Sequence, residues 1–254
     1  MSMAIEVRNV AKSFIIRHNR NNSLKSNIVG VFHKRFREDK EILWALKGVS
    51  FDIRHGEAVG LIGRNGSGKS TFLKLIAGIH RPTTGRMLIA RNARIASMIE
   101  LGVGFHPELT GRENVFLSAS IHGLNRAQIE HIYEGVVSYS GLGHFIDVPL
   151  KNYSSGMHMR LGFAIAANLD PDILLLDEIF AVGDAPFQQR CVETIQQFLE
   201  AGKTIVFVSH APSSVRLICR RVCVLESGTL AFDGDVDAGL AHYERSLGVD
   251  PGSV

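Results

Sequence analysis

Long apolar runs are missing from this sequence of 254 residues, since no stretch approaches the roughly 18 to 20 apolar residues that span a bilayer. The opening residues, MSMAIEVRNV, lack the basic segment and apolar run of a secretory signal. Cysteine is scarce as well. The odd set Cys191, Cys219 and Cys223 lies late in the chain, which indicates reduced thiols rather than disulfides or a metal cluster. The sequence therefore predicts a cytosolic or peripheral protein.

Excess charge of one sign is also missing. The 28 Lys and Arg against 25 Asp and Glu give a formal net charge of +3, which does not by itself indicate nucleic-acid binding. Apolar residues make up 45% of the chain and charged residues 21%, enough to build a sizeable core. The length fits one compact α/β domain with an inserted excursion.

Strand and helix patterns alternate along the chain. Strand-like runs cover residues 5–14 and resume after residue 43, and a helical pattern opening at Thr110 continues to Leu161. The apolar run in 172–178, the β-branched run 203–210 and a hairpin over 220–234 with a Ser-Gly turn follow, with a helix over 191–202 among them. We expect a sheet, a helical excursion and a return to the sheet.

A glycine-rich loop stands between a strand and a helix at residues 63–71. Its sequence GRNGSGKS matches the phosphate-binding pattern G-x-x-x-x-G-K-[ST], expected by chance in about one chain in a hundred of this length. Glycines let backbone N–H groups surround phosphate oxygens, Lys69 would reach the β and γ phosphates, and Ser70 would ligate Mg²⁺. The predicted nucleotide-binding residues are Gly63, Arg64, Asn65, Gly66, Ser67, Gly68, Lys69, Ser70 and Thr71.

Two carboxylates follow the apolar run ILLL. The end of a buried parallel strand is where open α/β sheets bind ligands, so Asp177 is expected to hold the Mg²⁺ shell. Glu178 would then orient and deprotonate an attacking water as the catalytic base. The alternative is a strand ending in a solvated acidic turn, and the phosphate loop elsewhere in the chain makes this alternative improbable.

Several motifs together carry a family resemblance. GRNGSGKS, YSSGMHMRLGFAIA, LLLDE and VSH resemble the nucleotide-binding domains of ABC transporters. LGVGFHPELTGREN, YSSGM and DEIFAVGDAPFQQRC look like the ATPase subunits of polysaccharide exporters of the Wzt type. The resemblance covers residues 4 to 235. It implies a RecA-like P-loop core with an antiparallel β-subdomain (1–104 and 162–254) and an inserted helical subdomain (105–161).

The resemblance assigns further site residues. Ser154, Ser155 and Gly156 stand where the family's signature loop contacts the γ-phosphate of the opposite subunit, although a serine N-cap without a ligand fits YSSGM as well. His210 matches the switch histidine, a catalytic residue beside the γ-phosphate, where a lone histidine would more often be solvent-facing. Asp184 matches the D-loop, and would otherwise pass as a turn acid.

Two assignments are less defined. Phe14 occupies the place of the aromatic residue that stacks on adenine, with Trp44 as competitor and core packing as the alternative for both. The family usually has a Gln before the helical subdomain, and none stands there. Glu100 is the candidate to approach Mg²⁺, with a register uncertain by one residue and an ordinary exposed Glu as the alternative.

A basic stretch, residues 17–40, separates the first two strand signals. It holds seven Lys or Arg against two acids, with Phe32 and Phe36 interleaved. Such a segment suits anionic lipid headgroups, a partner loop or nucleic acid, or is an inert solvated loop, and nucleic acid is the least favoured of these.

The resemblance implies a function. It describes a homodimer that binds ATP and Mg²⁺ in two composite sites and drives a separate membrane permease exporting a lipid-linked polysaccharide. We then expect a peripheral protein on the cytoplasmic face of the inner membrane, with no nucleic acid as partner. The alternative is a soluble ABC ATPase acting on the ribosome or on nucleic acid. Such factors usually carry two ATPase halves, and one is present here.

Overall fold

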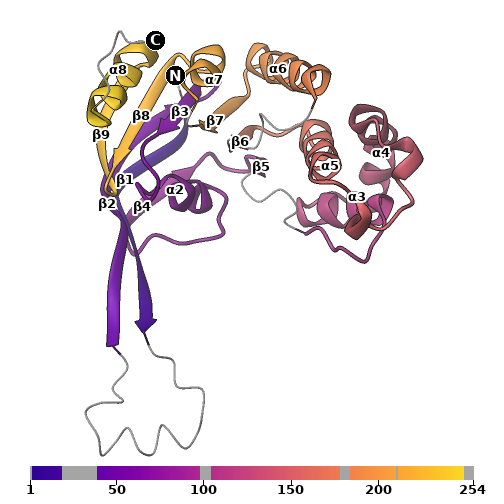
Figure 1. The fold of residues 1–254 in the computed structure, drawn as a ribbon, viewed down its shortest axis with the longest axis horizontal. Coiled ribbons are helices and arrows are strands. Elements are labelled where there is room, and N and C mark those ends of the chain that lie inside the picture. Colours follow the sequence, from indigo (N-terminus) through magenta and orange to yellow (C-terminus); the bar gives the residue numbers. More distant parts are fainter. Residues whose placement is uncertain (1, 19–38, 98–103, 178–183, 210, 249–254) are drawn as a thin grey trace, which may run out of the picture.

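The computed structural model describes residues 2–18, 39–97, 104–177, 184–209 and 211–248 (Figure 1). Two sheets and four helices form one side of the molecule, and a group of three α-helices forms the other. None of the helices in the described ranges combines the length and the apolar character that crossing a membrane takes.

An antiparallel sheet of three strands has the order β2-β1-β4. Buried apolar side chains alternate along its first strand, among them Ile5 and Val7, as the sequence pattern predicts. Its strands are β1 (Met3–His18), β2 (Asp39–Arg54) and β4 (Thr84–Ile89).

The β1–β2 hairpin is longer than the sequence predicts. Its ladder runs from Met3 opposite Arg54 to His18 opposite Asp39, and Figure 1 shows the far half projecting as an arm. Arg17 pairs with Lys40 within this ladder, so both ends of the expected basic insertion are strand residues, because backbone pairing continues past the apolar positions. Residues 19–38 lie outside the described residues.

A six-stranded sheet carries the order β5-β6-β7-β3-β8-β9, and all neighbouring strands are parallel except β9. All residues of β3, β6 and β7 are buried, which explains their unbroken apolar sequences. The predicted strands in 172–178 and 203–210 and the predicted hairpin are confirmed. The strands are β3 (Ala58–Ile62), β5 (Ile95–Ser97), β6 (Ile173–Leu176), β7 (Thr204–Val208), β8 (Arg221–Glu226) and β9 (Thr229–Asp235).

The helices accompanying the sheets bury one face each. The first of them lies between the two sheets, where Phe72 stacks on Phe51 of β2 with 5.1 Å between ring centroids. The others join the larger core that continues into the separate helical group. They are α2 (Lys69–Ile76), α6 (Ala185–Glu200), α7 (Pro212–Ile218) and α8 (Val236–Ser246).

The separate helical group begins where the sequence predicts. Thr110 caps its first helix, accepting from the N–H of Glu113 while the Glu113 carboxylate accepts from the N–H of Thr110. Its last helix continues to Asn168, beyond residue 161 where the helical subdomain is expected to end. The group holds α3 (Gly111–Ile121), α4 (Arg126–Ser140) and α5 (Ser155–Asn168), with the short 3₁₀ helices η2 (Gly143–Phe145) and η3 (Leu150–Asn152).

Arg221 joins the two sheets. Its guanidinium donates to both carboxylate oxygens of Asp233 at 2.6 and 2.8 Å, to Glu57 at 3.0 Å and to the carbonyl oxygen of Asp52 at 2.9 Å. The hydrogen bond to Asp233 holds the pKa of Arg221 above its ordinary value, and the side chain is only 24% exposed. Charge-assisted bonds in such a half-buried place are stronger than surface pairs.

We expect Arg221→Met to lower the free energy of unfolding by about 2 kcal/mol, because Asp233 and Glu57 would lose their cation. Arg216→Met is the matched control, since Arg216 is 49% exposed and pairs with the exposed Asp237, an ion pair of a kind worth about 0 to 1 kcal/mol. Urea unfolding of both variants measures the difference. Equal losses would contradict the role of Arg221 as a link between sheets.

Candidate nucleotide site

Three glycines give the phosphate loop its shape. Gly63, Gly66 and Gly68 have φ of 150°, 79° and 110°, a region that other residues rarely adopt. A Cβ at Gly63 would collide with the carbonyl oxygen of Leu225, and one at Gly68 would lie 2.6 Å from the carbonyl oxygen of Ala45. Gly66 has nothing within 4 Å of that position, so only its backbone conformation requires glycine there.

Lys69 is buried in this loop, with 6% of its surface exposed. Its Nζ donates to the carbonyl oxygens of Gly63 at 2.6 Å and Arg64 at 3.0 Å, which compensates for removing a charged group from water. It is the first residue of α2, whose N-cap Gly68 has no side chain to occupy the first N–H groups of the helix. An ammonium group and uncapped N–H groups at one place form an anion site.

A cavity of about 300 Å³ opens at this loop. One wall is the base of the β1–β2 hairpin, and the other is the loop with the end of β6. Phe14 and Trp44 both line it, so the structure brings both adenine-stacking candidates to one place. The lining residues are Phe14, Leu43, Trp44, Ala45, Asn65, Gly66, Gly68, Lys69, Ser70, Thr71, Asp177 and Val208.

The donor set fits Mg²⁺. Ser70 at the start of α2 and Asp177 directly after β6 line the same cavity, as the sequence predicts. A hydroxyl and a carboxylate are hard oxygen ligands of the kind that Mg²⁺ takes beside phosphate oxygens. The predicted residues Glu100, Glu178 and His210 lie outside the described residues, so their roles stay predictions.

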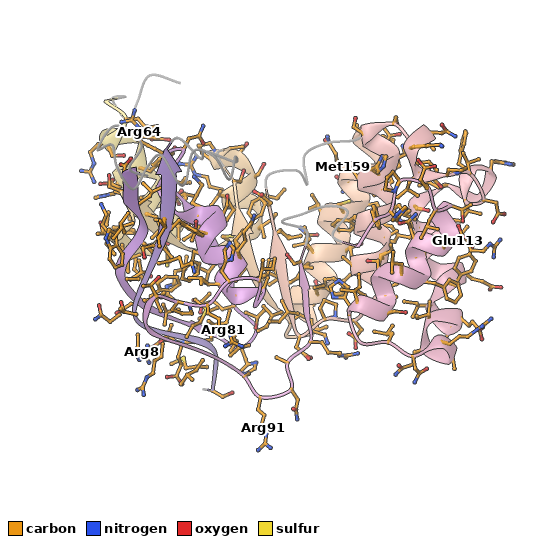
Figure 2. The ribbon with its side chains drawn as sticks, turned by 90° about the horizontal axis from the view of Figure 1, so that it is seen from below. Arg8, Arg64, Arg81, Arg91, Glu113 and Met159 are labelled. Atoms are coloured by element: carbon orange, nitrogen blue, oxygen red, sulfur yellow. The ribbon has the colours of Figure 1, made fainter. Side chains whose placement is uncertain are left out.

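The predicted signature loop lies away from this cavity. Ser154 is the N-cap of α5, and its Oγ accepts from the N–H of Met157 at 3.2 Å, so the capping alternative describes what the hydroxyl does here. Ser154 and Ser155 are exposed. Figure 2 shows Arg64 of the phosphate loop on one side of the molecule and Met159 of α5 on the other. A chain therefore does not place its own signature loop on its own phosphate loop.

Asp184 has a partner that sequence reasoning missed. Its carboxylate lies 2.7 Å from Nη2 of Arg160 on α5, and the Arg160 guanidinium packs over the ring of Phe187 at 5.4 Å. The predicted D-loop residue, at the N-cap of α6, is thus tied to the helix that carries the signature loop. No local pattern signals this pair, since the two residues come from different elements. Leu43, Ala45 and Val208 in the cavity were missed for the same reason.

Comparison with known proteins identifies the family. The family model described as ABC transporter matches residues 46–181, which is more than half of the chain. The chain belongs to the ABC transporter family. It is 43% identical over 251 residues to the O-antigen export system ATP-binding protein RfbB of Klebsiella pneumoniae, an alignment covering 97% of this chain and 100% of that protein.

A further relative and a solved structure support the same family. It is 41% identical to the teichoic acids export ATP-binding protein TagH of Lactiplantibacillus plantarum, over 95% of this chain and 64% of that protein. A dimeric ATP-binding cassette in a post-hydrolysis state bound to ADP and Pi superposes with a TM-score of 0.71 at 23% identity, covering 91% and 98% of the two chains. The predicted ABC-ATPase fold and the resemblance to Wzt-type ATPase subunits are confirmed.

Replacing Lys69 by Ala should weaken the binding of Mg-ADP and Mg-ATP at least tenfold, because the cavity would lose its buried ammonium group. Lys74→Ala, on the same helix but not lining the cavity, should bind both nucleotides as the unaltered protein does. Equilibrium titration with a fluorescent nucleotide measures both. Unchanged affinity in Lys69→Ala would contradict the nucleotide site.

Proposed function

We propose that this protein hydrolyses ATP to energise the export of a lipid-linked polysaccharide through a separate membrane permease. The observation that carries the proposal is a phosphate loop with Lys69, Ser70 and Asp177 in one cavity, in a chain of which 97% aligns with an O-antigen export ATP-binding protein. The phosphate-binding cavity and the relative's name thus both support an ATP-driven exporter subunit.

The described residues divide the binding work. Lys69 already forms two hydrogen bonds to loop carbonyls, and a phosphate oxygen would accept a stronger one because it is itself charged. Ser70 and Asp177 would hold Mg²⁺, which neutralises charge on the phosphates when bound. Phe14 or Trp44 would stack on the adenine ring from the hairpin wall. Glu178 as base and His210 beside the γ-phosphate complete the proposal from outside the described residues.

Hydrolysis in this proposal requires two chains. The signature residues Ser154, Ser155 and Gly156 would close over the nucleotide held by the partner subunit, in a sandwich with two composite sites. The exposure of Ser154 and Ser155 and the separation of α5 from the chain's own phosphate loop support this arrangement. Closure around ATP and opening after hydrolysis would move the attached permease.

The partners follow from the relatives. Two of them are named as ATP-binding proteins of O-antigen and teichoic acid export, so the exported substrate would be a polysaccharide of that class. An ATPase serving such a permease would lie on the cytoplasmic face of the inner membrane. The alternative of an ATPase acting on the ribosome or on nucleic acid is not favoured by these names.

Glu178→Gln tests the enzymatic and transport parts together. It keeps the side chain's size but removes proton acceptance, so we expect turnover to fall about 10²- to 10⁴-fold while ATP still binds. The variant should still copurify with a polytopic membrane protein from detergent extracts, as the unaltered chain should, and cells carrying only the variant should lose the surface polysaccharide. Copurification of ribosomes or nucleic acid instead would contradict the export proposal.

A disulfide between subunits tests the composite site. Asn65→Cys and Ser155→Cys, made in separate chains and mixed, place thiols at exposed positions of the phosphate loop and the signature loop. The native thiols give little background, because burial raises the pKa of Cys191 and Cys219 to about 12 and also raises that of Cys223. We expect a cross-linked dimer that forms only with Mg-ATP.

The control replaces Asn65→Cys by Arg91→Cys, at an exposed position that Figure 2 shows on another edge of the molecule. That mixture should give no cross-linked dimer under the same oxidant. Cross-linking that ignores nucleotide, or none at any ATP concentration, would refute the sandwich.

A further inference from the structure

The turn between β8 and β9 has a demanding backbone. Glu226 pairs with Thr229, and the two residues between them, Ser227 and Gly228, have φ of 49° and 86°. Positive φ at both central residues is the type I′ hairpin turn, which strongly favours glycine at the second. The hairpin could be closed by many such sequences, so its contacts decide whether this turn has another role.

Both polar backbone groups of Gly228 are used outside its own hairpin. Its N–H donates to the carbonyl oxygen of Ser67 in the phosphate loop at 3.1 Å. Its carbonyl oxygen accepts from the N–H of Lys47 on β2 at 2.7 Å. One turn residue therefore bonds the phosphate loop on one side and the antiparallel sheet on the other.

The same glycine has no room for a side chain. A Cβ there would lie 2.8 Å from the carbonyl oxygen of Ala45 and 3.3 Å from the Cα of Leu46. Gly68, the last loop residue before α2, packs against that same Ala45 oxygen, with 2.6 Å to its own would-be Cβ. A displacement of Gly228 thus acts on the Ser67 carbonyl directly and on Gly68 through Ala45.

The β8–β9 turn contacts the phosphate loop from outside the nucleotide cavity. Glu226 and Ser227 line a second cavity, of about 470 Å³, together with Arg64, Asn65, Gly66, Ser67 and Ser246 at the end of α8. The nucleotide cavity shares Asn65 and Gly66 with this second cavity, but none of residues 226–229 lines it. Any effect of the turn on nucleotide binding therefore passes through the loop or through Ala45, which the turn contacts and which lines the cavity.

We propose that Gly228 is a positioning residue for nucleotide binding, because it fixes the backbone of the phosphate loop at Ser67 and Gly68. The inference rests on the proposed function in taking a nucleotide as the ligand. A loop that binds phosphate through N–H groups needs those groups held in one direction before the ligand arrives. The hydrogen bond to Ser67 and the contact through Ala45 hold them.

Gly228→Ala tests the proposal against Gly202→Ala. Gly202 also has a positive φ, 75°, but nothing lies within 4 Å of its would-be Cβ, so the control shares the backbone penalty without the collision. We expect Gly228→Ala to raise the Kd for Mg-ADP and the KM for ATP about tenfold, with kcat changed less than about twofold. Gly202→Ala should leave Kd and KM unchanged, although both variants should unfold at lower denaturant.

The outcomes distinguish a failure of the proposed function from a failure of the positioning role of Gly228. Unaltered protein that fails to bind Mg-ADP would overturn the proposed function. Unaltered protein that binds, with Gly228→Ala and Gly202→Ala showing the same Kd and KM, would overturn the positioning role alone. A fall in kcat at unchanged Kd and KM would also overturn it, since the turn would then act on a later step.

Hydrogen exchange of the unaltered protein gives a test that needs no variant to fold. Binding and turn stability are linked reciprocally, so saturating Mg-ADP should slow amide exchange in the segment 226–229 together with the segment 63–71. The turn at 201–203 serves as the internal control and should exchange at the same rate with and without nucleotide. Unchanged exchange at 226–229 while 63–71 is protected would overturn the proposal.

Discussion

Contact of backbone against backbone, with no side chain between, is the constraint on which the nucleotide site depends. Gly63 packs against the carbonyl oxygen of Leu225 in β8, and Gly68 packs against that of Ala45 in β2. Since β8 belongs to the six-stranded sheet and β2 to the antiparallel sheet, the phosphate loop is wedged between both. The loop can take its binding shape only when the two sheets have docked, so the site is a product of the whole core.

The parts of the fold that depend on local chemistry were predictable. The apolar run of β6 predicted a buried parallel strand and the β-branched run of β7 a strand, and the helix start predicted at Thr110 is confirmed by its capping box with Glu113. The pairing of β4 with β1 was not predictable, because the exposed and half-buried residues of β4 carry little apolar pattern. The extension of β1 to Arg17 and of β2 to Lys40 was not predicted either, because pairing there depends on backbone hydrogen bonds and not on an apolar pattern.

The site shows the same division. Lys69, Ser70 and Asp177 came from sequence motifs, and the structure places all three in one cavity. The choice between Phe14 and Trp44 could not come from sequence. A register shift between Lys12 and Ser13 alters the alternation of the β1–β2 ladder, and both rings line the cavity. The pair of Arg160 with Asp184 joins α5 to α6, two elements whose contact only the tertiary fold creates.

The two hairpins of the core differ in how much chain they accommodate. Between β1 and β2 stand the residues 19–38, since His18 pairs with Asp39 at the end of their ladder. Between β8 and β9 the turn is Ser227 and Gly228 alone, with the Gly228 N–H and carbonyl both bonded to other elements. Insertions during evolution, or of an epitope tag at the bench, are thus admitted at the first hairpin and penalised at the second.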